Sequence, residues 1–242
     1  MSETMLEVAG LSAWYGAAQI LFDLSLEVRR GQVVALMGRN GAGKSTTMKA
    51  IMGLVGRRRG VARFNGHDIS RLEPYRIARL GMGFTPEDRR IFSGLTVLEN
   101  LDVGRQGPRC FADGTPAPAW TPDLLFGLFP NLGERRDRLG GQMSGGEQQM
   151  LTVARTLMGN PLLVLLDEPS EGIAPLIVEQ MADAIVALKE RGLSILLSEQ
   201  NLHFARLVAD RAYLLEKGHI AWEGPIADLV DDTDVQRAFL TM

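Results

Sequence analysis

The stretch GRNGAGKST, residues 38–46, follows the apolar run VVALM and precedes STTMKAIMGLVG, whose residue choice suits a helix. It fits the pattern G-x-x-x-x-G-K-[ST] in the strand, loop and helix context that this pattern requires. Its glycines let backbone N–H groups turn inward around phosphate oxygens, and the positive end of the following helix adds to the attraction. The alternative is a glycine-rich turn that only caps a helix, but such a turn would not require the lysine and the serine.

This loop predicts the residues that contact a bound nucleotide. We expect Lys44 to hold the β and γ phosphate oxygens and the Ser45 hydroxyl to face a magnesium ion. The other predicted contacts come from the rest of the loop: Gly38, Asn40, Gly41, Ala42, Gly43 and Thr46. The loop therefore predicts a nucleotide and magnesium as the ligands.

An acidic pair follows the apolar run of LLVLLDEP, residues 162–169. Asp167 is expected to coordinate magnesium directly or through water, and Glu168 to polarise the attacking water. Taken alone, two acids in this position could be a turn and a helix cap. Together with the phosphate loop they predict the groups needed for hydrolysis.

The order of the remaining elements predicts an α/β fold. Residues 6–36 read as an antiparallel β layer leading into a buried strand, and strands and helices alternate from residue 151 onward. Such alternation implies a parallel sheet with helices on both faces, and the helix-like patterns of residues 71–150 imply a helical insertion. GRQGPRCFADGTPAPAWTP, residues 104–122, is predicted to be an exposed irregular loop because it is rich in proline and glycine.

Composition limits the classes of partner. The net charge of -3 gives no global attraction to nucleic acid, and no apolar run approaches the roughly 18 residues of a membrane span. The single cysteine, Cys110, excludes an internal disulfide, so a reducing cytosol is expected, with any membrane role exerted through another protein. His67, His203 and His219 are isolated, which predicts no histidine metal site. GRRRG, residues 56–60, is predicted to be a solvated turn, with lipid headgroups or RNA as the alternative partners.

MSGGEQQ, residues 143–149, completes a recognisable set of motifs. The chain here resembles the ATP-binding-cassette (ABC) ATPases, in which an S-G-G-x-Q signature follows a helical insertion and precedes the second acidic strand. The resemblance implies a P-loop ATPase fold with a parallel-sheet core, an antiparallel β layer and an inserted helical subdomain. It implies one domain over 4–238, with a nucleotide-binding core at 4–88 and 151–238 and a helical subdomain at about 89–150.

The resemblance also assigns further site residues. Ser144, Gly145, Gly146 and Glu147 form the signature, a second phosphate cradle at a helix start that completes the ATP site of another ATPase domain in a head-to-tail dimer. Tyr15 matches the aromatic residue that stacks on adenine, although an ordinary surface tyrosine is the alternative. The loop SEGIAP, residues 170–175, corresponds to the one that crosses to the partner subunit.

Two positions depart from the usual family pattern. Glu87 stands where most members place a glutamine that senses magnesium and the transmembrane partner, and Gln200 stands where most place a histidine that contacts the γ-phosphate. Gln200 can donate an N–H to a phosphate oxygen, but it cannot titrate as a histidine does. We therefore expect Gln200 to be a γ-phosphate sensor with altered chemistry.

These departures resemble one subgroup, the second ATPase subunit of branched-chain amino-acid importers and their relatives for amides, urea or aromatic acids. The implied partners are transmembrane permease subunits, a separate solute-binding protein and a homologous ATPase, with a heterodimer in the cell and a homodimer open to the isolated chain. The implied location is peripheral, on the cytoplasmic face of the cell membrane. A soluble ATPase of DNA repair, chromosome structure or translation is one alternative. A regulatory module that hardly hydrolyses is another, which Gln200 leaves open.

The helical segment 89–150 is expected to contact the permease. Ile91, Phe92, Leu95 and Val97 form an apolar group beside two arginines that could fill a groove on a membrane-protein helix. Burial of this group in the protein's own core is the alternative.

Overall fold

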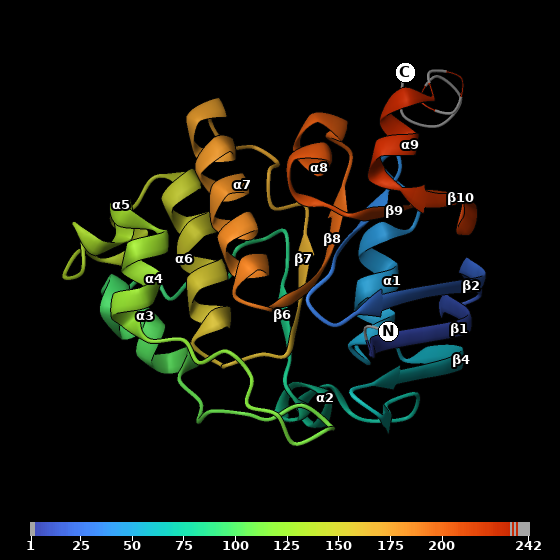
Figure 1. Cartoon of the computed structure of the whole chain (residues 1–242), viewed down its shortest axis with the longest axis horizontal. Coiled ribbons are helices and arrows are strands. Elements are labelled where there is room, and N and C mark those ends of the chain that lie inside the picture. The colour runs from blue at the N-terminus through green and yellow to red at the C-terminus, as the bar shows by residue number, and fades with distance from the viewer. Residues whose placement is uncertain (1–2, 233, 235, 237–242) are drawn as a thin grey trace.

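Two β-sheets and the helices around them form the part of the chain that the computed structural model describes, residues 3–232, 234 and 236 (Figure 1). The larger sheet has the strand order β10-β9-β3-β8-β7-β6, in which only β10 pairs antiparallel. Its strands are β3 Val33–Met37, β6 Met82–Thr85, β7 Leu163–Asp167, β8 Ser194–Glu199, β9 Arg211–Glu216 and β10 His219–Pro225. This topology confirms the predicted α/β fold.

Strands β3, β7 and β8 lie in the middle of this sheet and are buried along their whole length. Their sequences are nearly continuous apolar runs, as expected for strands covered on both faces. β7 ends at Asp167 and β8 at Glu199, side by side in the sheet, so polar side chains gather at one edge. That edge is where open α/β sheets bind ligands.

The second sheet is antiparallel, with the order β2-β1-β4-β5. Its strands are β1 Thr4–Tyr15, β2 Ala18–Arg29, β4 Arg57–Phe64 and β5 His67–Asp68. Helix α1, Lys44–Ile51, packs with this sheet against one face of the large sheet, in a core that includes Leu6, Leu36 and Met48. The predicted antiparallel layer is therefore present, and it places β1 next to the phosphate loop.

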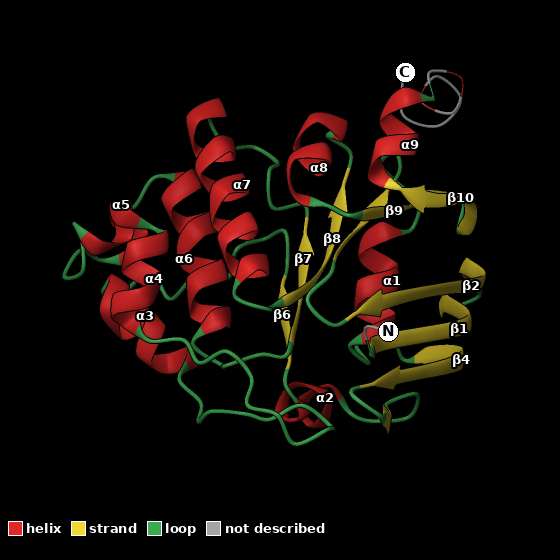
Figure 2. Cartoon of the chain, viewed as in Figure 1, coloured by secondary structure: helices red, strands yellow, loops and turns green. Residues whose placement is uncertain are grey.

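The other face of the large sheet is covered by helices. Figure 2 shows α6 and α7 on one side of β7 and β8 and α1 on the other side. The core on this side joins residues such as Leu151, Ile185 and Phe204 to the strands. The helices outside the antiparallel layer are α2 Pro74–Leu80, α3 Val97–Gly104, α4 Pro122–Leu128, α5 Pro130–Gly133, α6 Gly145–Leu157, α7 Pro175–Glu190, α8 Leu202–Val208 and α9 Ile226–Asp231, with a 3₁₀ turn at Gly140–Gln142.

One prediction about an irregular segment was wrong, and another was confirmed only in part. Residues 57–60 of the expected GRRRG turn form the first half of β4, because they pair with β1. The segment 104–122 has little regular structure, as predicted, but it is not simply exposed: Phe111 and Trp120 are buried, and the Arg30 guanidinium lies 3.5 Å from the centre of the Phe111 ring. The predicted limit at residue 238 lies outside the described residues.

Candidate active site

The phosphate loop lies between β3 and α1, and α1 begins at Lys44, as predicted. Gly38 has a φ of 149°, and a Cβ atom there would lie 2.4 Å from the carbonyl oxygen of Leu215, so no other residue fits without a shift of the backbone. The Lys44 side chain is buried, and its Nζ donates to the carbonyl oxygens of Gly38 at 2.8 Å and Arg39 at 3.3 Å. The backbone of the loop thus surrounds the Lys44 ammonium group.

Asp167, at the end of β7, meets the phosphate loop. Its Oδ1 accepts hydrogen bonds from Ser45 Oγ at 2.9 Å and from Ser198 Oγ at 2.7 Å. Ser45 belongs to α1 and Ser198 to β8, so the aspartate joins three elements that are distant in the sequence. The predicted oxygen donors Ser45 and Asp167 are therefore brought together.

Glu168 lies between Lys44 and Gln200. Its Oε1 is 3.1 Å from Lys44 Nζ, both side chains are buried, and its Oε2 accepts from Gln200 Nε2 at 3.2 Å. Burial raises the pKa of Glu168, but the hydrogen bond with Glu171, the Lys44 charge and the Gln200 amide together lower it below its ordinary value. The backbone of Glu168 has a φ of 49°, in the sparsely populated left-handed region that strained functional residues often adopt. The carboxylate is thus held in its ionised form.

Two further carboxyl groups surround Glu168. Glu171 is exposed overall, but the hydrogen bond with Glu168, the partial loss of water around its carboxyl, and the negative charges of Glu168, Glu87 and Glu199 raise its pKa to about 7. Burial also raises the pKa of Glu199, although the backbone N–H groups of Ser170 at 3.0 Å and Gln200 at 3.2 Å donate to its carboxylate. The edge of the sheet therefore carries a concentration of acids with one buried cation, Lys44, among them.

A cavity of about 470 Å³ opens above these groups. Tyr15, half exposed at the end of β1, lines the cavity together with Glu87 and the acids Glu168 and Glu171. The predicted loop residues that line it are Asn40, Gly41, Gly43, Lys44, Ser45 and Thr46. Gly38, Ala42, Asp167 and Gln200 are not among its lining residues, but the last two bond directly to residues that are.

The predicted signature residues lie elsewhere, at the start of α6. Ser144 is the N-cap, its Oγ accepts from the Glu147 backbone N–H at 3.4 Å, and its own N–H donates to Glu147 Oε2 at 2.8 Å. A Cβ atom on Gly145 would lie 2.8 Å from Nη1 of Arg89, so the guanidinium covers this glycine. None of Ser144, Gly145, Gly146 and Glu147 lines the cavity at the phosphate loop.

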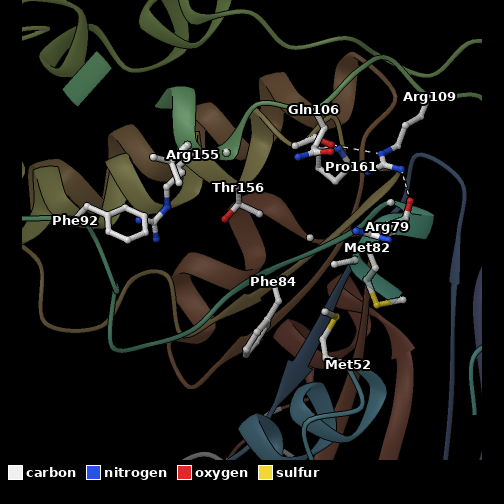
Figure 3. A pocket seen from close by; sticks show the side chains of 16 residues that line it. Met52, Arg79, Met82, Phe84, Phe92, Gln106, Arg109, Arg155, Thr156 and Pro161 are labelled. Atoms are coloured by element: carbon white, nitrogen blue, oxygen red, sulfur yellow. Dashed lines mark hydrogen bonds between the residues drawn. The ribbon is translucent and has the colours of Figure 1, made fainter. Parts of the chain in front are cut away.

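A second cavity, of about 600 Å³, lies between α2, β6 and the helices α3 and α6 (Figure 3). Phe92 is 47% exposed and lines it, with its ring centre 5.0 Å from the Arg155 guanidinium. Ile91 and Leu95 are half-buried, whereas Val97 is fully buried in the core. The apolar group predicted here is therefore divided: Val97 belongs to the protein's own core, and Phe92 faces the cavity.

Three residues of the site received no predicted role. Ser198 and Glu199 belong to LLSEQN, residues 196–201, whose apolar run stops on several polar residues at the end of β8, a pattern that predicts side chains delivered to this edge of the sheet without saying what they do. Glu171 carried no such signal, because it lies in a loop whose path back toward Glu168 depends on the folded chain.

Two kinds of feature are absent from the described residues. No helix is both long enough and apolar enough to cross a membrane. No group of three or more histidine, cysteine, aspartate or glutamate residues is placed to hold a metal ion.

Comparison with known proteins gives matches over most of the chain. A family model described as ABC transporter matches residues 21–171. The chain is 42% identical over 236 residues to the high-affinity branched-chain amino acid transport ATP-binding protein BraG of Pseudomonas aeruginosa, a match that covers 98% of this chain and 99% of BraG. It is 35% identical to the lipopolysaccharide export system ATP-binding protein LptB of Haemophilus influenzae, over 98% of this chain and 97% of LptB. A crystal structure of an ATP-binding cassette of an ABC transporter in its ADP conformation superposes with a TM-score of 0.79 at 26% identity, covering 98% of each chain.

Proposed function

The chain belongs to the ABC transporter family of ATPases, so it is the ATPase subunit of a transporter, and we propose that this transporter imports branched-chain amino acids. The observation that carries the proposal is the 42% identity to BraG over nearly the full length of both chains, against 35% to LptB. Relatives that import amides, urea or aromatic acids would share the same ATPase chemistry. The identity of the solute therefore needs a test separate from that of ATP hydrolysis.

ATP would bind in the cavity at the phosphate loop. Lys44 points into the curve of the loop, where the β and γ phosphates of a nucleotide would replace the carbonyl oxygens of Gly38 and Arg39 as its partners. Tyr15 is half exposed at the mouth of the same cavity, with its ring available to stack on a base. The residues Gly38, Asn40, Gly41, Ala42, Gly43 and Thr46 would supply the remaining loop contacts.

Magnesium would be held by Ser45, Asp167 and the phosphate oxygens. The hydroxyl of Ser45 and the carboxylate of Asp167 are only 2.9 Å apart, and both are oxygen donors of the kind that this hard cation prefers, so the residues present fit the ion. Glu87 lines the same cavity and is a further oxygen donor. When bound, the ion would neutralise charge on the phosphate oxygens.

Glu168 would act as the general base. Its pKa is lowered, so it is ionised at neutral pH and can accept a proton from a water molecule that attacks the γ-phosphate. In the described structure its two oxygens are engaged by Lys44 and Gln200. Moving Lys44 onto the phosphates would release Oε1 for the water, while Gln200 keeps the carboxylate oriented or turns its amide toward the γ-phosphate.

A complete site would need two ATPase chains. The signature residues Ser144–Glu147 lie at the start of α6, away from the cavity of their own chain, and the N-terminal end of this helix offers backbone N–H groups to an anion. We therefore include a head-to-tail dimer in the proposal, in which each signature closes the other chain's site. A heterodimer with a homologous ATPase is the expected cellular form, and the isolated chain is able to form a homodimer.

The cavity in Figure 3 would receive the permease. It lies beside the exposed ring of Phe92 and combines apolar side chains such as Met52 with the cations Arg79 and Arg155, so it suits an amphipathic helix of a membrane protein. We propose that residues 89–150 form the helical subdomain that makes this contact, within a domain whose core is 4–88 and 151–238. The assembled importer would place the chain on the cytoplasmic face of the cell membrane, with a separate solute-binding protein on the opposite side.

Solute uptake tests the proposal. A strain that lacks this chain should lose uptake of labelled leucine, isoleucine and valine, and a plasmid copy should restore it. A Lys44→Ala copy should fail to restore it. Unchanged leucine uptake together with lost uptake of urea, an amide or an aromatic acid would contradict the branched-chain assignment and leave the import assignment standing. An outer-membrane defect with every uptake intact would favour export.

A further inference from the structure

A group of six arginines on β4, the turn between β5 and α2, and α2 itself forms a surface that we call the arginine face: Arg57, Arg58, Arg59, Arg71, Arg76 and Arg79. Residues 57–79 contain seven arginines against two acids, Asp68 and Glu73, whereas the whole chain has a net charge of -3. The rest of the chain is therefore strongly acidic. The ATPase chemistry described above does not use this concentration of positive charge.

The part of the arginine face on β4 is held in place by an aromatic ring. Arg57 and Arg59 point to the same side of the strand, and their guanidinium groups lie 4.8 and 5.8 Å from the ring centre of Trp14 on β1. Arg58 is fixed by its donation to the carbonyl oxygens of Val55 at 3.1 Å and Leu72 at 3.0 Å. Guanidinium groups that stack on a ring or bind carbonyl oxygens keep their full charge available to an anion.

The arginine face is hollowed next to β4. A cavity of about 210 Å³ is lined by Arg58, Arg59 and Arg71 together with Ser70 and Gly60. No described carboxylate forms an ion pair with any of the six arginines, and the one ion pair in this stretch joins Arg63 to Glu7 at 3.5 Å. Hydrogen bonds with Ser70 lower the pKa of the nearby Asp68 carboxyl and the charge of Arg71 helps to lower it, but Asp68 forms no direct ion pair with Arg71. Three cations that line one concave surface, with no carboxylate bonded to them, favour an anionic group there.

The arginine face continues along α2 to the cavity proposed for the permease. Tyr75 is 54% exposed, and the guanidinium groups of Arg76 and Arg79 lie 5.8 and 5.6 Å from its ring centre. Arg79 also lines the permease cavity, and the nearby Leu54 is 51% exposed. Exposed arginine, tyrosine and leucine side chains, with a half-buried tryptophan against two of the arginines, are of the kinds that anchor proteins at a membrane interface.

We propose that the arginine face binds the anionic phospholipid headgroups of the membrane around the permease, an inference that rests on the proposed placement of the chain beside that permease. The attraction would orient the chain, because the strongly acidic remainder is repelled by the same membrane surface. The exposed Leu54 favours lipid over nucleic acid, because an aliphatic side chain has no partner on a phosphate backbone but does have one at a bilayer surface.

Vesicle sedimentation of the purified chain, without permease or nucleotide, tests this inference separately from the transport function. The chain should bind vesicles that contain 30% phosphatidylglycerol in phosphatidylcholine, should not bind pure phosphatidylcholine, and should bind less as salt rises. Replacing Arg59 and Arg71 by glutamate should weaken binding about tenfold or more, because each basic residue near an anionic surface contributes several-fold. The matched control replaces Arg138 and Arg206, two exposed arginines outside the arginine face, by glutamate and should bind nearly as the unchanged chain does.

Thermal melting and ATP binding by both double variants would show that they are folded. No binding to the anionic vesicles at low salt would overturn the inference. Equal weakening in the two double variants would also overturn it, because net charge rather than the arginine face would then explain binding. Tighter binding of a 20-nucleotide RNA than of the vesicles, lost in Arg59→Glu/Arg71→Glu, would assign the surface to nucleic acid instead.

Discussion

The ammonium nitrogen of Lys44 lies 3.1 Å from a carboxylate oxygen of Glu168, and both side chains are buried. A buried ion pair stays favourable only while both charges are present, because an unpaired buried charge is costly. In this structure the charge of Lys44 is therefore balanced by that of Glu168. A nucleotide phosphate would compete with Glu168 for Lys44, so ATP binding would release the Glu168 carboxylate to act as the base.

Lys44→Ala should abolish ATP binding, because it removes the charge that would hold the β and γ phosphates. Binding of a fluorescent ATP analogue and steady-state ATPase activity measure the effect. Lys49→Ala is the matched control, since Lys49 lies on the same helix but does not line the cavity. ATPase activity of Lys44→Ala equal to that of the unchanged chain in the assembled complex would remove the assignment of the phosphate loop.

Glu171→Gln should raise thermal stability at pH 8 but not at pH 5. The folded-state pKa of Glu171 is raised to about 7. Protonated Glu171 therefore stabilises the fold fully at pH values below its unfolded-state pKa, and this stabilisation is lost as pH rises through about 7. Glutamine imitates the protonated form at every pH. Because Glu171 is exposed and water screens the repulsion, the gain in Tm at pH 8 should be small, about 2 °C.

The control for this experiment is Glu179→Gln, an exposed carboxylate on α7. It should change Tm equally at both pH values. If the Tm difference between Glu171→Gln and the unchanged chain does not grow from pH 5 to pH 8, then Glu171 is not held beside Glu168.

Gln200→Ala should lower ATP hydrolysis about fivefold, because one hydrogen bond of about 1 kcal/mol net to Glu168 or to the phosphate is lost. In a heterodimer whose other ATPase carries a histidine at this position, replacing that histidine by alanine should reduce transport more. Transport and hydrolysis are measured in the reconstituted complex. Equal and near-complete losses from both substitutions would show that the two sites are equivalent and that Gln200 is not a weaker sensor.

Phe92→Asp should uncouple transport from ATP binding, because it places a charge where the exposed ring would contact the permease. Solute uptake should fall to background while the isolated chain binds ATP normally. Leu207→Asp, at an exposed apolar residue of α8 that does not line this cavity, is the matched control and should retain uptake. A Phe92→Asp chain that does not fold would mean that the ring belongs to the protein's own core.

Local spacing made much of the fold predictable, together with the places of two motifs in it. The phosphate loop follows β3, and Asp167 and Glu168 stand at the end of β7, because both motifs directly follow apolar runs in the sequence. The roles of these residues stay predictions. The bond between Ser45 and Asp167 spans 122 positions, so the sequence predicted that these residues share an ion but not how they meet. The prediction of a turn at residues 56–60 was wrong for a related reason. β4 forms through pairing with β1, where Arg57 lies opposite Trp14, and the local sequence carries no information about that pairing.

The segment 104–122 illustrates the same limit. Its proline and glycine content predicted irregular backbone correctly, but exposure depends on what the folded chain brings to it. Arg30 reaches this segment from the end of β2, stacks on Phe111 and donates to Asp113 at 2.9 Å. These contacts join positions that no local pattern relates.

The most direct test of the central claim, that Glu168 is the base of an ATPase whose phosphates are held by Lys44, is a Glu168→Gln substitution measured for ATP binding and hydrolysis in the same preparation. The glutamine keeps the size and the hydrogen bonds of the side chain but loses the charge that accepts a proton. The variant should bind Mg-ATP at least as well as the unchanged chain, hydrolyse it about 10²-fold or more slowly, and accumulate as an ATP-bound dimer on sizing chromatography. Hydrolysis at the unchanged rate, with binding intact, would contradict the claim.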